Sequence, residues 1–231
     1  MDQRSPEPAG TPVGRRTVLG LIALGAAGVF GGNWLQNRLA ELLAPVEAND
    51  PTGLTALLPL GQAFRLYSVT GSVPRRTAAG YRLDVAGLVA RTARYSLPDL
   101  QAMPQTSLVR DFQCVTGWRV PAVHWAGVPL SALLDRSAPA PDATAVRFYS
   151  FDGTYTESMT LAEARRPDVL VALRMLDGPV TPEHGGPVRI YAASMYGYKS
   201  TKWLSRIELT HGEVPGYWEQ FGYDIDGTIG T

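Results

Sequence analysis

The chain has 231 residues, a length that suits one compact domain with an additional terminal segment. Its 45% apolar and 18% charged content is that of a globular protein, and 24 glycines with 18 prolines favour many turns over a helical bundle. The formal net charge is zero, which excludes the strongly basic field that a nucleic-acid partner requires.

The first segment predicts export. Residues 1–14 are polar, and Arg15 and Arg16 then precede an apolar run from Thr17 to about Gly32. A basic pair before a modest Gly- and Ala-rich run resembles a twin-arginine signal, although the usual Ser or Thr before the pair is absent. No small-x-small cleavage site follows closely, so residues 1–32 are interpreted as a removed signal or an uncleaved membrane anchor. A buried amphipathic helix is the third alternative.

We interpret residues 33–60 as a linker and residues 61–231 as the folded domain. In the first half of this domain, residues 81–85 alternate apolar and polar side chains and predict a half-buried strand. Ser96, with Asp99 three residues later, predicts the start of a short helix. A second alternating run over residues 108–113 leads directly to Cys114, which should therefore lie at a strand end or on the following loop.

The second half of the domain continues in the same way. Gly127–Leu130 is expected to open a helix through about Asp135, because Pro is tolerated in the first turn. Residues 146–151 predict a strand, and Thr160–Glu163 is a capping box for a further short helix. More strands are expected over residues 169–176, 188–193 and 203–209. Together these elements indicate one strand-rich α+β domain with short helices between the strands.

Cys114 is the only cysteine, and the three histidines cannot complete a zinc site with it at any familiar spacing. If it binds a metal, a cofactor must supply most of the other ligands. The residues alone leave three interpretations of this side chain: a metal ligand, a nucleophile or a small buried apolar group. Of the 21 basic residues only Lys199 and Lys202 are lysines. Their proximity indicates either a local site or chance in an Arg-rich chain.

Four segments occur in an order that is typical of one family. They are Tyr81–Val89; Cys114–Trp118 with Trp125–Leu130; His184–Arg189; and Tyr196–Trp203. Through them, about residues 60–215 resemble the molybdopterin-binding domain of the sulfite-oxidase superfamily, which includes the periplasmic methionine sulfoxide reductase catalytic subunit. The resemblance implies a mixed α+β fold of this type and a molybdenum-molybdopterin cofactor.

The resemblance also implies roles for single residues. Cys114 matches the cysteine that binds molybdenum equatorially, beside the two dithiolene sulfurs of one pyranopterin and the oxo groups. His184 and Arg189 match positions that contact the pterin and its phosphate, and an Arg fork suits phosphate. Alternatively, His184 ends a turn and Arg189 is a surface residue of a strand. The stretch after the Tyr-Gly-aromatic motif implies further phosphate contacts, from Lys199, Ser200, Thr201 and Lys202.

Weaker matches concern the substrate side of the site. Ser150 matches a small hydroxyl position near the cofactor. Tyr67 and Ser68, with Val69, stand where sulfite oxidases carry an Arg-Asn-His run, so one expected cation is missing. Sulfite would need cations such as Arg110 and Arg119, whereas a neutral sulfoxide would favour an aromatic mouth. The candidates for that mouth are Trp118, Trp125 and Tyr196. For Trp118 and Trp125 the alternative is a role in the core.

The implied reaction is oxygen-atom transfer or a related two-electron step on a small molecule. Electrons are exchanged with a separate protein, for which a membrane-bound protein is the first candidate. No Cys-x-x-Cys-His haem signature is present, and no immunoglobulin-like domain is expected. The expected location is the periplasm or the outer face of the cytoplasmic membrane. Two rivals remain: a thiol enzyme with His124 or His184 as its base, and a catalytically silent, membrane-tethered binding module.

Overall fold

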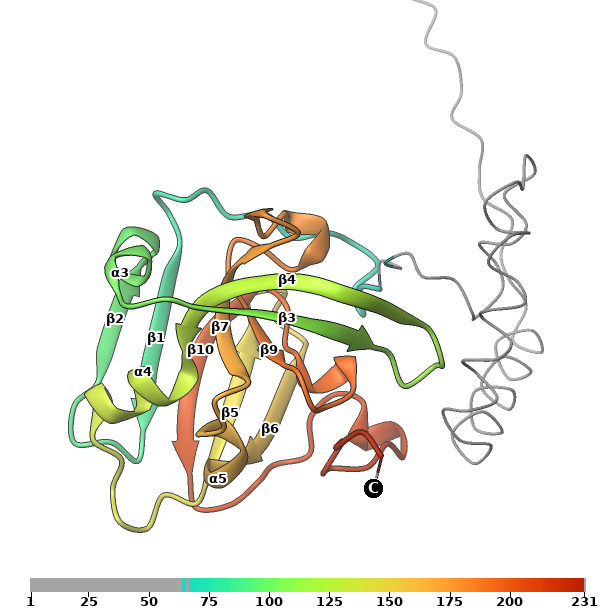
Figure 1. The fold of residues 1–231 in the computed structure, drawn as a ribbon. Coiled ribbons are helices and arrows are strands. Elements are labelled where there is room, and N and C mark those ends of the chain that lie inside the picture. Colours follow the sequence, from blue (N-terminus) through green and yellow to red (C-terminus); the bar gives the residue numbers. More distant parts are fainter. Residues whose placement is uncertain (1–63, 65–66, 231) are drawn as a thin grey trace, which may run out of the picture.

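The computed structural model describes Phe64 and residues 67–230, and these form one mixed and one antiparallel sheet with short helices between and around them (Figure 1). The first sheet has the strand order β2-β1-β10-β5-β6, and the second has the order β3-β4-β7-β8, with β9 also paired to β7. The segment expected to be an export signal or anchor and the linker lie outside the described residues. Within the described residues, no helix is long and apolar enough to cross a membrane.

The strands of the first sheet are β1 (Arg82–Gly87), β2 (Ala93–Ser96), β5 (Ala145–Ser150), β6 (Thr156–Thr160) and β10 (Leu204–Thr210). Those of the second sheet are β3 (Thr106–Gln113), β4 (Arg119–Pro129), β7 (Val169–Met175), β8 (Gly178–Pro179) and β9 (Arg189–Ala192). The α-helices are α3 (Leu97–Ala102), α4 (Leu130–Ser137) and α5 (Leu161–Ala164), and the 3-10 turns are η2 (Pro182–His184), η3 (Gly197–Lys199) and η4 (Glu219–Phe221).

Local sequence signals account for several of these elements. The period of two in β1 buries Leu83 and Val85 against the core. At α3, the Ser96 hydroxyl accepts from the amide of Asp99 at 3.3 Å, and the Asp99 carboxylate accepts from the amide of Ser96 at 2.8 Å. The same reciprocal pair occurs at Thr160 before α5. Both predicted capping boxes are therefore confirmed, and they fix where the two helices begin.

The start of α4 differs from the prediction. The chain stays extended through Pro129, and the helix begins at Leu130 rather than near Gly127. Gly127 is held against β7 so closely that a Cβ would lie 2.1 Å from the carbonyl oxygen of Val171. This close approach keeps residues 127–129 in the β4 ladder with β7. The long strand β4 itself was not predicted.

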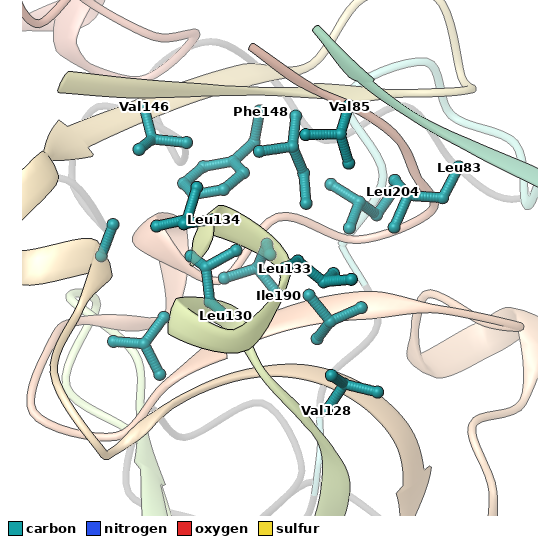
Figure 2. Packing of buried hydrophobic residues seen from close by; sticks show 14 of the residues in the cluster. Leu83, Val85, Val128, Leu130, Leu133, Leu134, Val146, Phe148, Ile190 and Leu204 are labelled. Atoms are coloured by element: carbon teal, nitrogen blue, oxygen red, sulfur yellow. The ribbon is translucent and has the colours of Figure 1, made fainter. Parts of the chain in front are cut away.

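The main core lies where α4 meets the two sheets (Figure 2). Leu130, Leu133 and Leu134 of α4 are each fully buried. In the figure Leu134 lies toward Val146 and Phe148 of the first sheet, and Leu130 and Leu133 lie beside Ile190 of the second sheet. Burying an aliphatic side chain of this size contributes about 1.5–3 kcal/mol each. The helix therefore joins the sheets into one apolar interior.

A second, smaller core cluster lies within the second sheet, on the side of Cys114. The rings of Trp125 and Tyr191 are stacked with centroids 4.0 Å apart, and the ring of Phe112 packs beside Trp118. Trp125 is only 1% exposed, which supports the core role among its alternatives. The side chain of Cys114 packs against this aromatic cluster.

Candidate active site

Cys114 lies on a tight turn between β3 and β4. Its amide donates to the carbonyl oxygen of Trp118 at 2.9 Å, and the amide of Gly117 donates to the carbonyl oxygen of Cys114 at 3.0 Å. Gly117 has a φ of 99°, which glycine adopts at little cost. The thiol is partly buried and lies 3.2 Å from the hydroxyl of Thr116. Cys114 thus lies on the loop that follows β3, as the sequence indicated.

A pocket opens beside this thiol. Its cavity volume is about 160 Å³. Several of the residues that sequence reasoning proposed come together in its wall, from segments that are far apart in the chain. These are Tyr67, Cys114, His184, Arg189, Ser200 and Lys202.

Arg189 is buried at the start of β9 and is held by backbone carbonyls. Its terminal nitrogens donate to the carbonyl oxygens of His184 at 2.7 Å and Ser200 at 3.0 Å. Burial lowers the pKa of this guanidinium to about 10, so it remains charged at neutral pH. Each terminal nitrogen carries a second hydrogen. Arg189 thus ties together the two segments of the predicted phosphate site and brings a fixed positive charge to the pocket.

Lys202 lines the same pocket as Cys114 and Asp152. Its Nζ donates to the carbonyl oxygen of Tyr67 and lies 4.5 Å from the ring centre of Trp203. Burial, followed by the positive charge of Arg189, lowers the pKa of Lys202 to about 7. Burial and the same two cations also lower the pKa of His184. The pocket therefore destabilises protonated side chains, and a bound anion would relieve that cost.

Four other predicted residues do not line this pocket. Lys199 is fully buried in an ion-pair cluster with Glu157 and Glu219. Ser68 donates to the carbonyl oxygen of Ser72 at 2.5 Å. The Ser150 hydroxyl accepts from the amide of Asp152 at 3.1 Å, and Ser150 lines a separate polar cavity at the outer side of the first sheet. Thr201 is buried, and its hydroxyl has no partner among the described residues.

Part of the pocket wall is aromatic, and sequence reasoning found only some of its residues. Trp118, which had a core role as its alternative, is only 2% exposed and still lines the pocket. Burial, and then the charge of Cys114, raises the pKa of Tyr223, which lines the same pocket. The missed residues lie outside any recognisable motif, so only the folded chain reveals them; they are Phe64, Phe112, Tyr155, Trp218 and Tyr223.

Residues that had been considered for other roles lie elsewhere. Arg119 forms an ion pair with Asp111 and does not line the pocket, and neither does Arg110. The ring of His124 pairs with Asp177 at 2.9 Å on the surface. Of the two bases proposed for a thiol enzyme, only His184 therefore lines the same pocket as Cys114.

Comparison with known proteins decides the family. Residues 70–218 match the family described as the oxidoreductase molybdopterin binding domain. The chain belongs to this family.

Individual relatives agree with the assignment. The uncharacterised oxidoreductase YuiH of Bacillus subtilis is 33% identical over 159 residues, which cover 68% of this chain and 80% of YuiH. The protein-methionine-sulfoxide reductase catalytic subunit MsrP of Ralstonia nicotianae is 28% identical, with 88% of this chain and 71% of MsrP covered. The sulfane dehydrogenase SoxCD of Paracoccus pantotrophus superposes with a TM-score of 0.58 at 19% identity, over 68% of this chain and 46% of that chain, which shows a shared fold.

The protein is thus a molybdopterin-dependent oxidoreductase of the sulfite-oxidase type, related to MsrP, and its cofactor is the molybdenum cofactor. The residues of the pocket fit that group. Among the described residues, no cluster of His, Cys, Asp and Glu can hold a metal ion by itself, so the dithiolene sulfurs suit the single thiol of Cys114. The anionic phosphate suits Arg189 and Lys202, whose pKa values are both lowered by burial.

Proposed function

We propose that this protein is an exported enzyme whose pocket beside Cys114 holds the molybdenum cofactor and carries out oxygen-atom transfer or a related two-electron step on a small sulfur-oxygen compound. The observation that carries the proposal is the convergence of Cys114, Arg189 and Lys202 on one pocket. When bound, the cofactor supplies the two-electron chemistry at molybdenum. The protein groups bind the cofactor, orient it and exclude water.

Each residue of the proposed site has a distinct task. Cys114 offers a thiolate to the metal, and its turn is fixed by the bond from its own amide to Trp118. Arg189 and Lys202 bind the phosphate, while His184 and Ser200, whose carbonyl oxygens accept from Arg189, keep that cation in place. We assign no cofactor contact to Ser68, Ser150, Lys199 and Thr201, because these residues do not line the pocket.

For the substrate we favour a neutral sulfoxide over sulfite. An anion such as sulfite would need cations beyond those that hold the phosphate, and Arg110 and Arg119 do not line the pocket. Aromatic side chains do line it near the thiol, and these suit an apolar thioether or sulfoxide group. The name of the MsrP relative, a protein-methionine-sulfoxide reductase, supports the same choice.

Electrons are exchanged with a separate protein, for which a membrane-bound partner is the first candidate. The enzyme itself acts in the periplasm or at the outer face of the cytoplasmic membrane. The support for export is the Arg15-Arg16 pair before an apolar run, a pattern typical of twin-arginine signals. Export in the folded state suits a protein that receives its cofactor in the cytoplasm.

The proposal is tested by the molybdenum and pterin content of protein made in cells that synthesise the cofactor. We expect about one molybdenum per chain in the wild type and a loss of pterin in Lys202→Ala, because a phosphate-binding cation is removed. Arg165→Ala is the matched control, since it removes a cation from an exposed ion pair with Asp135 outside the pocket. Full pterin content in Lys202→Ala would contradict the phosphate role.

A further inference from the structure

Lys199 is a buried ammonium whose donors are all used inside the protein. Its Nζ donates to Glu157 at 2.8 Å, to Glu219 at 3.1 Å and to the carbonyl oxygen of Ile225 at 2.5 Å. The side chains of Lys199, Glu157 and Glu219 are 0%, 0% and 3% exposed. An ammonium has three hydrogens, so these acceptors occupy all of them. Lys199 thus has no donor left for a ligand in the pocket.

The cluster holds two carboxyl groups around one ammonium. Burial, and then a hydrogen bond with Glu219, raises the pKa of Glu157 well above its usual range, which favours its protonated form. The Oε2 atoms of Glu157 and Glu219 are buried and have no hydrogen-bond partner among the described residues. A buried group of this kind is costly to break from one side, because it leaves an uncompensated charge.

Two of the acceptors of Lys199 belong to the chain that follows β10. Glu219 lies in η4, and Ile225 comes soon after it. Other bonds join the same two regions: Tyr198 Oη donates to the carbonyl oxygen of Asp224 at 2.7 Å, and the amide of Ile229 donates to that of Ser194 at 3.0 Å. The contact is close, since a Cβ at Gly227 would lie 2.7 Å from Cγ of Lys199. Residues 194–199 therefore hold the segment 216–230.

That segment, drawn in red in Figure 1 near the end of the β3–β4 pair, forms part of the pocket wall. Trp218 and Tyr223 both line the pocket that Cys114 also lines. Lys199 supplies the charged bonds to this wall, beside backbone bonds from the amide of Tyr217 to Thr156 and from the amide of Tyr196 to Gly227. The position of two lining residues thus depends in part on Lys199.

We propose that Lys199 is a positioning residue that holds residues 216–230 in place as one wall of the cofactor pocket, rather than a contact to the cofactor. The inference rests on the proposed function only for the identity of what occupies the pocket. Its mechanical part, the dependence of the segment on the lysine, can be measured without any substrate.

The test is hydrogen–deuterium exchange of the full chain, purified from cofactor-making cells, with molybdenum and pterin measured on the same samples. Glu219→Ala removes the charged acceptor on the tail side and leaves the bonds of Lys199 to Glu157 and to the carbonyl oxygen of Ile225, so the domain should still fold. Lys199→Met removes all three bonds. Peptides covering residues 216–230 are expected to exchange about tenfold faster in both variants, since a buried charge-assisted bond is lost. Exchange of β5 and β7 should stay at wild-type levels.

Glu219→Gln is the conservative rescue, because its amide oxygen can still accept from Lys199; it should restore slow exchange. Arg165→Ala controls for the loss of an ordinary surface ion pair and should leave residues 216–230 protected. Unchanged exchange of this segment in Glu219→Ala would overturn the proposal. So would loss of pterin in Lys199→Met with the segment still protected, since Lys199 would then act on the cofactor. A failure of the proposed function would instead appear as missing molybdenum in the wild type.

Discussion

Gly185 and Lys202 are packed so closely that no methyl group fits between them. A Cβ at Gly185 would lie 2.5 Å from both Cβ and Cγ of Lys202, and Gly185 has a φ of 95°. The contact places the turn that follows His184 directly against the lysine of the proposed phosphate site. The amide of Trp203 also donates to the carbonyl oxygen of Gly185 at 2.7 Å, so a backbone hydrogen bond joins the same two segments.

Gly185→Ala is therefore expected to displace Lys202 and to lower the stability by about 2–4 kcal/mol, through overpacking added to backbone strain. Pterin content should fall with it. Gly222→Ala is the matched control, because Gly222 has the same φ of 95° and open space around its Cβ position. It should cost only about 1–2 kcal/mol of backbone strain. Equal losses of stability in urea denaturation would show that the contact with Lys202 is unimportant.

The lowered pKa of Lys202 predicts a pH-dependent stability of the cofactor-free protein. The pKa is about 7 in the fold and about 10.4 in an unfolded chain, so the unfolded state binds more protons between these values and stability rises with pH there. Lys202→Met removes this dependence. The melting temperature of the variant minus that of the wild type should therefore increase as the pH falls from 9 to 6, by about 3 °C or more. A difference that is constant with pH would contradict the burial of a charged Lys202.

The choice of substrate is tested by steady-state kinetics with an artificial electron donor or acceptor. We expect a higher kcat/KM for methionine sulfoxide reduction than for sulfite oxidation, because the free lining near Cys114 is aromatic. Arg119→Ala should change either value less than about threefold, since this residue pairs with Asp111 away from the pocket. Efficient sulfite oxidation that is lost in Arg119→Ala would reverse the assignment.

Export is tested with the double substitution Arg15→Lys and Arg16→Lys, which keeps the charge and alters only the guanidinium pair. The wild-type chain should reach the periplasmic or membrane fraction, and the variant should accumulate in the cytoplasm with its cofactor bound. Equal distribution of the two proteins between fractions would show that the pair is not an export signal.

Local signals in the sequence predicted the parts of the fold that depend on neighbouring residues. The capping boxes at Ser96 and Thr160 and the alternation in β1 are of this kind. The strand β4 was missed because Pro121, Gly127 and Pro129 interrupt its pattern. Its pairing with β3 and β7 is long-range, and register shifts in both ladders accommodate the irregular residues.

The site was predictable to the extent that motifs carry it. Cys114, Arg189 and Lys202 lie in recognisable segments, and the structure brings them to one pocket. Two lysines three positions apart look equivalent in the sequence, yet the turn η3 directs Lys199 toward buried carboxylates while Lys202 reaches the pocket. Trp218 and Tyr223 belong to no motif, and their place depends on tertiary contacts alone.

The central claim is that Cys114 is a ligand of the molybdenum. X-ray absorption at the molybdenum edge counts sulfur neighbours directly, and Cys114→Ser replaces the soft thiolate with a hydroxyl of similar size. The account predicts that the wild-type spectrum contains one more sulfur ligand than the spectrum of the cofactor-loaded Cys114→Ser variant. An identical sulfur count in the two proteins would contradict it.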